Sequence, residues 1–386
     1  MTDFFENKNL EITVTCAAGI EKATKSEIKR LFGKEPPANR GAISFIGDAS
    51  DIACCNMRLR TADRVYVCAA EFPAPDFDSL YEGTRAVDWH RIMPANARIL
   101  INGKCHKSRL FAVSSCQRII KKAIADRLCS VYKMRLLPET GEEYSFEFRI
   151  ENDVAKILLD TSGTGLHKRG YRDMVGIAPI KETLAAALVL LSGYFWERPF
   201  ADPFCGSGTL AIEAAMIALD IAPGLNRKFA FDGWSGFDKR HKELIYQQAK
   251  DSERPERRLE FSASDIDGKA VKMAERHAVR AGVGDRINFR VSDVKSFTST
   301  LKGGTIVTNP PYGERVYDKN EAKECYVSLR NVFDRLDNWS LFVITAADFF
   351  CKQFGLKPDR NRKLFNSNKE CRFYYYYGKG EDNAHR

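Results

Sequence analysis

From residue 199 onward, short apolar segments alternate with longer segments of helical periodicity, and this alternation is the feature that most constrains the fold. Strands are predicted at six places: 200–201, 258–263, 287–291, 305–308, 341–345 and 372–377. Strands that are short, apolar and separated by helices are typical of a parallel sheet buried on both faces. The sequence therefore predicts a doubly wound, mostly parallel α/β sheet in this part of the chain.

The preceding half contains two shorter units of mixed strands and helices. The first has predicted strands at 10–16, 41–46 and 64–72 and predicted helices at 20–32 and 51–59, with Gly33 as a C-cap. It is expected to form a small α/β sandwich that ends at a break, Pro73-Ala74-Pro75. The second has a predicted helix at 78–87, a strand at 97–103, a loop at 104–109, a helix capped by Ser114 or Ser115 that runs to Tyr132, and strands at 144–151 and 154–160.

Positive charge is concentrated in the second of these units. The chain has a net charge of +9, and residues 98–135 alone hold ten lysines and arginines against one acid, Asp126. Such a local excess favours a polyphosphate partner, whereas helix faces that mix both signs are usually only solvated. We expect this unit to bind nucleic acid through the following side chains: Lys104, Lys107, Arg109, Arg118, Lys121 and Lys122.

A glycine-rich segment follows the first strand of the predicted parallel sheet. It reads Asp202-Pro203-Phe204-Cys205-Gly206-Ser207-Gly208-Thr209 and precedes an apolar helix at 210–219. Glycines let the backbone approach a ligand closely, and the helix start offers unpaired N–H groups. A Walker loop is excluded because its Lys-Ser/Thr ending is missing, and the dinucleotide fingerprint is excluded because its third glycine is missing. An adenosyl cofactor without a pyrophosphate fits better than a bare strand-to-helix turn.

Two further acidic motifs follow predicted strands of the same sheet. In Ser264-Asp265-Ile266-Asp267, Asp265 is the candidate acceptor for ribose hydroxyls, and Asp267 is predicted to cap the helix at 269–281. In Val291-Ser292-Asp293-Val294, Asp293 either accepts from an adenine amino group or caps the next turn. Ile266 and Val294 are expected to line the same cofactor site.

The most specific motif is Thr308-Asn309-Pro310-Pro311-Tyr312-Gly313-Glu314-Arg315, at the end of a predicted strand. Exocyclic base amines are poor nucleophiles because their lone pair is delocalised into the ring. The Asn309 side-chain oxygen and the Pro310 carbonyl can accept hydrogen bonds from such an amine, and the prolines hold the backbone in place. Tyr312 can stack on a base drawn out of its helix. An ordinary Asn-Pro turn would explain only part of this motif.

Together these motifs resemble the class I S-adenosylmethionine-dependent amino-methyltransferases. Two upstream segments, Leu166-His167-Lys168-Arg169-Gly170-Tyr171-Arg172 and Ala178-Pro179-Ile180-Lys181-Glu182-Thr183-Leu184, are similar to a narrower family, the THUMP-domain RNA methyltransferases. Members of that family are often described as N6-adenine-specific DNA methylases, and they are similar to the bacterial enzyme that makes N2-methylguanine in 23S rRNA. The likeness includes Gly19-Ile20-Glu21 and Ile221-Ala222-Pro223-Gly224, and it covers essentially the whole chain.

The resemblance implies an N-terminal ferredoxin-like part at 1–65, a THUMP RNA-binding domain at 66–165 and a Rossmann-like methyltransferase domain at 166–386. It implies direct SN2 methyl transfer from S-adenosyl-L-methionine to guanine N2 of 23S rRNA, with S-adenosyl-L-homocysteine as the product. Asp265 and Asp293 would hold the adenosyl group, and the segment 202–209 would surround the methionine end and the ribose. The residues Asn309, Pro310, Pro311 and Tyr312 would act on the target amine, with Asn309 also beside the cofactor.

Other functions use the same residues. Adenine-N6 methylation of RNA or DNA is the principal alternative, because the motif at Asn309 accepts either amine. Methylation of a protein glutamine would also use this motif but would not need a basic N-terminal half. An RNA-binding module without catalysis would not need the motif at all.

The remaining expectations concern metals, membranes and location. The eleven cysteines include no CxxC pair, so we expect no metal site and a reduced, cytoplasmic environment. The longest apolar stretch, 184–196, is interrupted by Ser192 and Gly193, so we expect a buried helix and no membrane span. The segment 220–258 lengthens the spacing between Asp202 and Asp265, and the sequence assigns it no role.

Overall fold

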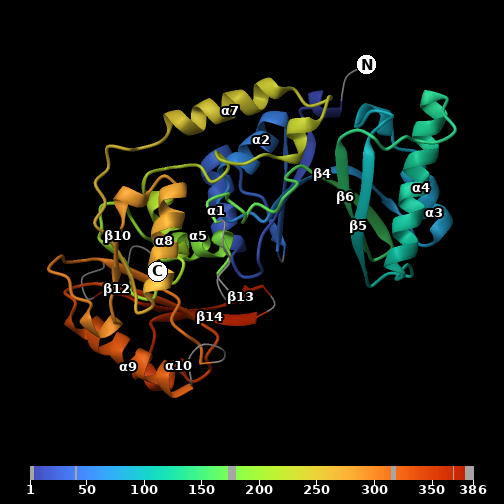
Figure 1. Ribbon diagram of the computed structural model, residues 1–386. Helices are drawn as coiled ribbons and strands as arrows, with labels where there is room; N and C mark the ends of the chain where they lie inside the picture. Colours follow the sequence, from blue (N-terminus) through green and yellow to red (C-terminus); the bar gives the residue numbers. More distant parts are fainter. Residues whose placement is uncertain (1–3, 40, 173–179, 314–318, 368, 379–386) are drawn as a thin grey trace.

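The computed structural model describes all residues except 1–3, 40, 173–179, 314–318, 368 and 379–386. Four residues of the sequence motifs, Ala178, Pro179, Glu314 and Arg315, therefore lie outside the described residues. The described strands form two seven-stranded sheets, one from each half of the chain (Figure 1). None of the described helices is long and apolar enough to cross a membrane.

The N-terminal sheet has the strand order β2-β3-β1-β4-β7-β6-β5, in which the β5–β6 pair is parallel and the other pairs are antiparallel. Its strands are β1 (Leu10–Thr15), β2 (Ala38–Asn39), β3 (Ala42–Gly47), β4 (Arg64–Pro73), β5 (Arg98–His106), β6 (Glu143–Glu151) and β7 (Val154–Asp160). The first predicted unit is present, with β1, β3 and β4 in one sheet beside α1 and α2, but the sequence did not reveal that this sheet continues into the second unit. Strand β4 pairs with β1 through residues 64–67 and with β7 through residues 66–73, so both units share one sheet.

The helices of this half are α1 (Glu21–Phe32), α2 (Ala49–Arg58), α3 (Phe77–Arg85) and α4 (Val113–Tyr132). Gly33 adopts φ 66° as the C-cap of α1, which confirms the sequence prediction. The predicted capping of α4 by Ser114 or Ser115 is wrong, since Ala112 precedes the helix without a side-chain cap bond. The predicted loop at 104–109 also begins too early, because pairing of β5 with β6 continues to His106 and places Lys104 on a strand.

The C-terminal sheet has the order β10-β9-β8-β11-β12-β14-β13, with five parallel strands followed by an antiparallel hairpin. Its strands are β8 (Phe200–Asp202), β9 (Phe261–Asp265), β10 (Asn288–Val291), β11 (Thr305–Thr308), β12 (Ser340–Thr345), β13 (Arg360–Asn366) and β14 (Lys369–Tyr376). This confirms the predicted doubly wound, mostly parallel sheet. The sequence missed β13 because this edge strand is mostly polar, and Leu364 is its one buried residue.

Helices cover both faces of this sheet. They are α5 (Glu182–Leu191), α6 (Thr209–Ala218), α8 (Gly268–Arg280), α9 (Lys319–Arg335) and α10 (Phe350–Phe354). Helix α7 (Lys239–Asp251), from the same half of the chain, packs against α2 instead. Apolar residues of α5, α6 and α8 pack in one core, and those of α9 and α10 pack in another. Nearly every residue of α5 and α6 is buried, so the apolar stretch after residue 184 is a core helix as predicted, although it ends at Leu191.

The segment 220–258 packs on the N-terminal half rather than on its own sheet. Phe231, Trp234 and Phe237 belong to the same core as strand β1 and helix α2. The Trp234 indole stacks on Tyr144 of β6 at 4.9 Å and donates to the Glu143 carbonyl at 3.0 Å. Helix α7 lies beside α2 at the top of the molecule (Figure 1). The segment therefore joins the two halves, a role that its sequence did not reveal.

A buried polar network reinforces this junction. The Arg169 guanidinium donates to the carbonyls of Arg60 and Leu166, and its Nε lies 3.5 Å from the Glu213 carboxylate of α6. The Tyr171 hydroxyl donates to the same carboxylate at 3.1 Å. Arg60 in turn donates to the Ile221 carbonyl at 2.8 Å. The upstream motif at 166–172 therefore has a structural role, because it ties the N-terminal half to the helix that begins at the glycine-rich segment.

Candidate functional site

The sheet topology brings three of the sequence motifs to one edge. Asp202, Asp265 and Thr308 are the last residues of β8, β9 and β11, and the carboxyl ends of parallel strands meet at the same edge of a sheet. Two hydrogen bonds link the motifs directly. The Gly206 N–H donates to Asp265 Oδ2 at 2.9 Å, and the Thr308 hydroxyl donates to Asp202 Oδ1 at 2.7 Å.

The glycine-rich segment turns sharply between β8 and α6. Gly206 and Gly208 have φ values of +50° and +83°, which glycine adopts without strain. A Cβ atom on Gly208 would lie 2.8 Å from the Ala274 Cβ, so this glycine allows the segment to pack closely on α8. A Cβ atom on Gly206 would meet no described atom within 4 Å, so the chain leaves space there for a ligand.

The Asp202 carboxylate has one satisfied oxygen and one without a partner. The residue is 1% exposed, and Oδ1 accepts from Thr308 and from the Phe204 N–H. Oδ2 is buried and has no hydrogen-bond partner among the described residues. Burial raises the pKa of Asp202 to about 7, against the hydrogen bond from Thr308, which lowers it. A buried acceptor without a partner fits a ligand that brings a donor or a positive charge.

Asp265 holds the glycine-rich segment in place and also lies at the edge of the sheet where the motifs meet. Its Oδ2 accepts from Gly206, and its Oδ1 accepts from the Asp267 N–H at 3.0 Å. A carboxylate has about four acceptor positions, so both oxygens can still receive hydroxyl groups. The Asp267 side chain accepts from the Lys269 N–H at 2.8 Å, which confirms its predicted role as a helix cap. The neighbouring Ile266 side chain is 59% exposed, so an aromatic ring could cover it.

The structure gives Asp293 a capping role. Its Oδ1 accepts from the Lys295 N–H at 2.8 Å at the start of a short 3-10 helix, Val294–Ser296. Its contact with an adenine remains a prediction. The Val294 side chain is buried in the core beneath α9, so only its backbone could reach a cofactor.

The motif that follows β11 is held from two sides. The Tyr312 hydroxyl donates to Asn309 Oδ1 at 2.7 Å, and the Tyr326 hydroxyl of α9 donates to the Pro311 carbonyl at 2.7 Å. Lys369, the first residue of β14, places its ammonium 5.0 Å from the centre of the Tyr312 ring. Sequence reasoning missed Tyr326 and Lys369, which lie far from the motif along the chain and carry no local signal.

The predicted RNA-binding cations differ in their surroundings. Lys104, Lys107, Arg109 and Arg118 are exposed, with Arg109 beside Asp153 at 3.5 Å. Two cations further along α4 are engaged within the protein. Lys121 pairs with Glu139 at 2.9 Å, and the Lys122 ammonium lies 5.8 Å from the centre of the Tyr81 ring.

The turn between β5 and α4 also carries Phe111, which is 82% exposed. An exposed aromatic ring within a basic turn is a feature of nucleic-acid surfaces, because base faces stack on such rings. Sequence reasoning missed Phe111, although an aromatic residue two positions after Arg109 was the available signal.

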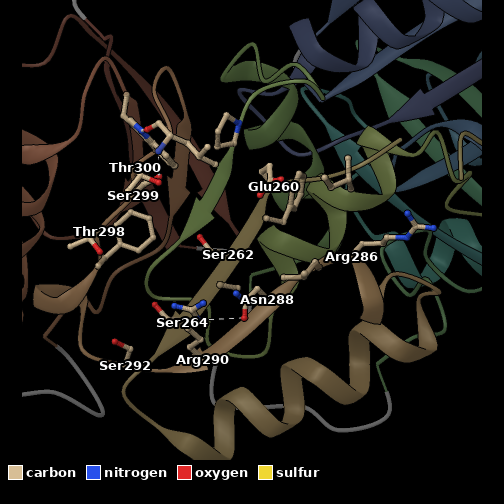
Figure 2. Close-up of a pocket in the computed structure, with 18 of the residues that line it drawn as sticks. Glu260, Ser262, Ser264, Arg286, Asn288, Arg290, Ser292, Thr298, Ser299 and Thr300 are labelled. Atoms are coloured by element: carbon tan, nitrogen blue, oxygen red, sulfur yellow. Dashed lines mark hydrogen bonds between the residues drawn. The ribbon is translucent and has the colours of Figure 1, made fainter. Parts of the chain in front are cut away.

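A cavity of about 540 Å³ lies next to this site. Figure 2 shows it along β9 and β10, with Ser262, Ser264, Asn288 and Arg290 pointing into it. Asp265, the next residue on β9, does not line it. The charges of the residues that line the cavity cancel, because the lining contains two arginines and two acids: Arg286, Arg290, Glu260 and Asp285. The cavity therefore offers no excess charge for a polyanion.

One cluster of described residues has the composition of a metal site. Glu11, Cys68 and Glu71 offer ligand atoms within 4.8 Å of one another. The Lys156 ammonium already pairs with Glu11 at 2.7 Å and with Glu71 at 3.0 Å, which accounts for the two carboxylates without an ion. Absence of a metal remains a prediction.

Comparison with known proteins identifies three matching domain families. Residues 169–374 match the RMKL-like methyltransferase domain, residues 11–66 the RlmL ferredoxin-like domain and residues 74–160 the THUMP domain. The chain is 43% identical over 374 residues to a protein of Bacillus subtilis (strain 168) named "Putative RNA methyltransferase YpsC", covering 96% of this chain and 97% of that one.

Solved structures agree over almost the whole chain. SMU.472, described as "a putative methyltransferase complexed with SAH", has a TM-score of 0.92 and 36% identity, covering 97% of this chain and 100% of that one. A "predicted N6-adenine-specific DNA methylase" from Listeria monocytogenes str. 4b F2365 has a TM-score of 0.92 and 41% identity, covering 97% and 98%. With the glycine-rich segment, Asp265 and the Asn309 motif at one edge of the sheet, these matches show that the chain belongs to the RMKL-like methyltransferase family and is an S-adenosylmethionine-dependent methyltransferase.

Proposed function

We propose that this enzyme methylates N2 of a guanine in 23S rRNA. The observation that carries the proposal is the motif at 309–312, which follows β11 and is joined through Thr308 and Asp202 to the glycine-rich segment. An acceptor for a base amine and a ring that can stack on a base therefore lie beside the proposed cofactor site. A fixed arrangement of this kind lowers the entropic cost of bringing two reactants together.

The residues of the glycine-rich edge fit S-adenosylmethionine. Bound there, this cofactor supplies a methyl group that is activated by attachment to a positively charged sulfur. We assign the ribose hydroxyls to Asp265, the methionine end to the segment 202–209, and the adenine to the region of Ile266 and Asp293. The unpartnered Oδ2 of Asp202 suits the positive charge at the methionine end.

The residues at 309–312 would position the target amine. Asn309 Oδ1 accepts one hydrogen bond from Tyr312 and has a second lone pair for the amine, while the Pro310 carbonyl would accept its other hydrogen. These bonds would direct the nitrogen lone pair toward the methyl group. The proton can leave after the new C–N bond forms, because the alkylated amine is acidic, so a strong general base is not required. Lys369 covers one side of the Tyr312 ring, and a flipped base would stack on the other.

We propose RNA as the substrate because of features of the N-terminal half. Its THUMP match, the exposed cations at Lys104, Lys107, Arg109 and Arg118, and the exposed ring of Phe111 support a surface for nucleic acid. The relative from Bacillus subtilis is also described as acting on RNA. We propose the division 1–65, 66–165 and 166–386 for the three domains. We also propose a cytoplasmic location, in keeping with eleven cysteines that form no disulfide.

Adenine N6 is the second candidate target. The motif at Asn309 accepts an amine of either base, and the relative from Listeria monocytogenes is described as an N6-adenine-specific DNA methylase. The N-terminal surface favours RNA over DNA, and the whole-chain resemblance to the guanine-N2 enzymes favours guanine.

The test uses the purified full chain, labelled S-adenosylmethionine and 23S rRNA transcribed without modifications. Digestion to nucleosides should release labelled N2-methylguanosine. The Asn309→Ala variant should form no product while it still binds the cofactor in calorimetry, since Asn309 is proposed to act on the amine.

Labelled N6-methyladenosine as the sole product would replace guanine with adenine and leave the mechanism intact. Preferential labelling of duplex DNA would overturn the assignment of RNA. Asn309→Ala activity equal to that of the unmodified enzyme would overturn the role given to the motif.

A further inference from the structure

The β13–β14 hairpin carries an excess of positive charge that the sequence analysis did not single out. Residues 360–372 contain five cations and a single acid, Glu370: the cations are Arg360, Arg362, Lys363, Lys369 and Arg372. Arg360, Lys363 and Arg372 are exposed, and the Lys363 side chain retains 54% of its accessible surface. This part of the molecule therefore presents concentrated charge to the solvent outside the THUMP domain.

Two of these cations face each other across the hairpin. In the register of the antiparallel pair, Lys363 of β13 lies directly opposite Arg372 of β14. Like charges in this position destabilise a sheet. The Glu370 carboxylate pairs with Lys363 at 2.6 Å, and Arg372 donates to the Asn361 side chain at 3.2 Å. One carboxylate cannot neutralise both cations, so the pair keeps an excess of positive charge.

The hairpin also reaches the Asn309 motif. Its tip closes with the pair Asn366–Lys369, and Lys369 lies over the Tyr312 ring. The Cys371 sulfur is 4.0 Å from the Tyr312 hydroxyl. Because side chains alternate along a strand, Lys363 and Arg372 lie on the face of the hairpin opposite to Lys369 and Cys371. These two cations could therefore contact only nucleotides that flank the one stacked on Tyr312.

The hairpin is held firmly in this place. A Cβ atom on Gly19, which has φ +97°, would lie 2.6 Å from the Lys363 carbonyl, so only glycine allows this approach. Arg362 donates to the Gly19 carbonyl at 3.1 Å, and Leu364 is buried in the core. The hairpin thus projects from the catalytic domain against the N-terminal half, on the side of the molecule away from α7 (Figure 1).

We propose that the β13–β14 hairpin is a second RNA-binding element, which holds the phosphates of nucleotides that flank the one presented to Tyr312. The inference rests on the proposed function, and it adds a contact outside the THUMP domain. Phosphates bound between Lys363 and Arg372 would neutralise the positive charge that this unfavourable pair retains. RNA binding would therefore account for a pair of cations that destabilises the hairpin.

The test is the double variant Lys363→Gln with Arg372→Gln, measured by filter binding to unmodified 23S rRNA between about 50 and 200 mM salt. The slope of log K against log salt should fall in magnitude by about 1.4–1.8, which corresponds to two lost phosphate contacts. Removal of a like-charge pair should leave the melting temperature within ~2 °C of the unmodified protein. KM for RNA should rise, with kcat at saturating RNA and cofactor affinity unchanged.

The matched control is Lys239→Gln with Arg240→Gln, which removes two exposed cations from α7 on the other side of the molecule. An unchanged salt slope in the hairpin variant, or an equal decrease in the control, would overturn the hairpin as an RNA site. A decrease in kcat without a change in KM would also overturn it, since the hairpin would then act on Tyr312. These outcomes would leave the proposed function standing, whereas failure of the unmodified protein to bind RNA would overturn both.

Discussion

Replacing Asp265 with alanine should distinguish the role of this residue in binding the cofactor from its role in stabilising the fold. In the unmodified protein this carboxylate accepts N–H bonds from Gly206 and Asp267, at 2.9 and 3.0 Å. The variant loses both bonds as well as the proposed bonds to the ribose hydroxyls. Both stability and cofactor affinity should therefore fall, by amounts that can be assigned separately.

The expected magnitudes follow from the bonds that are lost. Two backbone hydrogen bonds at about 1 kcal/mol each should lower the free energy of unfolding by about 2 kcal/mol. Loss of the charge-assisted bonds to the ribose should weaken S-adenosylmethionine binding by about 1.5–3 kcal/mol, or roughly 10- to 150-fold in Kd. Detachment of the Gly206 loop would add to the loss of affinity.

Calorimetric titration with S-adenosylmethionine measures the loss of affinity, and urea unfolding measures the loss of stability. Asp267→Ala is the matched control, because that side chain caps α8 through the Lys269 N–H. It should cost about 1 kcal/mol of stability and leave the cofactor affinity unchanged. Unchanged affinity in a folded Asp265→Ala protein would refute the assignment of Asp265, as would an equal loss of affinity in Asp267→Ala.

Three further predictions concern other parts of the molecule. Since burial raises the pKa of Asp202 to about 7 from an ordinary 3.8, the unliganded fold favours the neutral carboxyl and should lose stability as pH rises from about 4 to about 7. Binding of the positively charged cofactor should tighten as pH rises through about 7, and calorimetry of Asp202→Asn should show less of this dependence. Phe111→Ala should weaken binding of single-stranded RNA by about 1–3 kcal/mol in fluorescence anisotropy and change the melting temperature little, and equal RNA affinity would contradict the stacking role. Arg169→Met should cost about 3–5 kcal/mol in urea unfolding by leaving Glu213 buried without its cation, and adding Glu213→Gln should restore part of this loss; a cost below about 1 kcal/mol would contradict the network.

Much of the candidate site could be predicted because its motifs are local. Gly206 and Gly208 stand at turn positions that require positive φ, Asp267 stands where a helix begins, and the Asn309 motif ends a strand. Each depends on residues a few positions apart, so the chemistry is visible in the sequence. Once the strands are recognised as parallel, their carboxyl ends must share one edge, and the motifs are expected to meet there.

Other features depend on residues that are distant along the chain. The approach of Lys369 to Tyr312 and of Tyr326 to Pro311 depends on how β14 and α9 pack around β11. The unpartnered oxygen of Asp202 and its raised pKa depend on complete burial, which no local pattern encodes. Sequence reasoning listed Lys121 and Lys122 together with Lys104, yet only the structure shows that the first two have partners within the protein.

By itself the sequence determined the order of the elements, the parallel sheet and the residues that carry the chemistry, because hydrophobic periodicity and turn residues act over a few positions. The tertiary structure decided that β4 joins two units into one sheet, that Trp234 attaches the segment 220–258 to the N-terminal half, and that Lys363 and Arg372 lie opposite each other on the β13–β14 hairpin. These outcomes depend on which distant segments pair or pack against one another. Such choices depend on burial and register across the whole fold rather than on the preferences of any single segment.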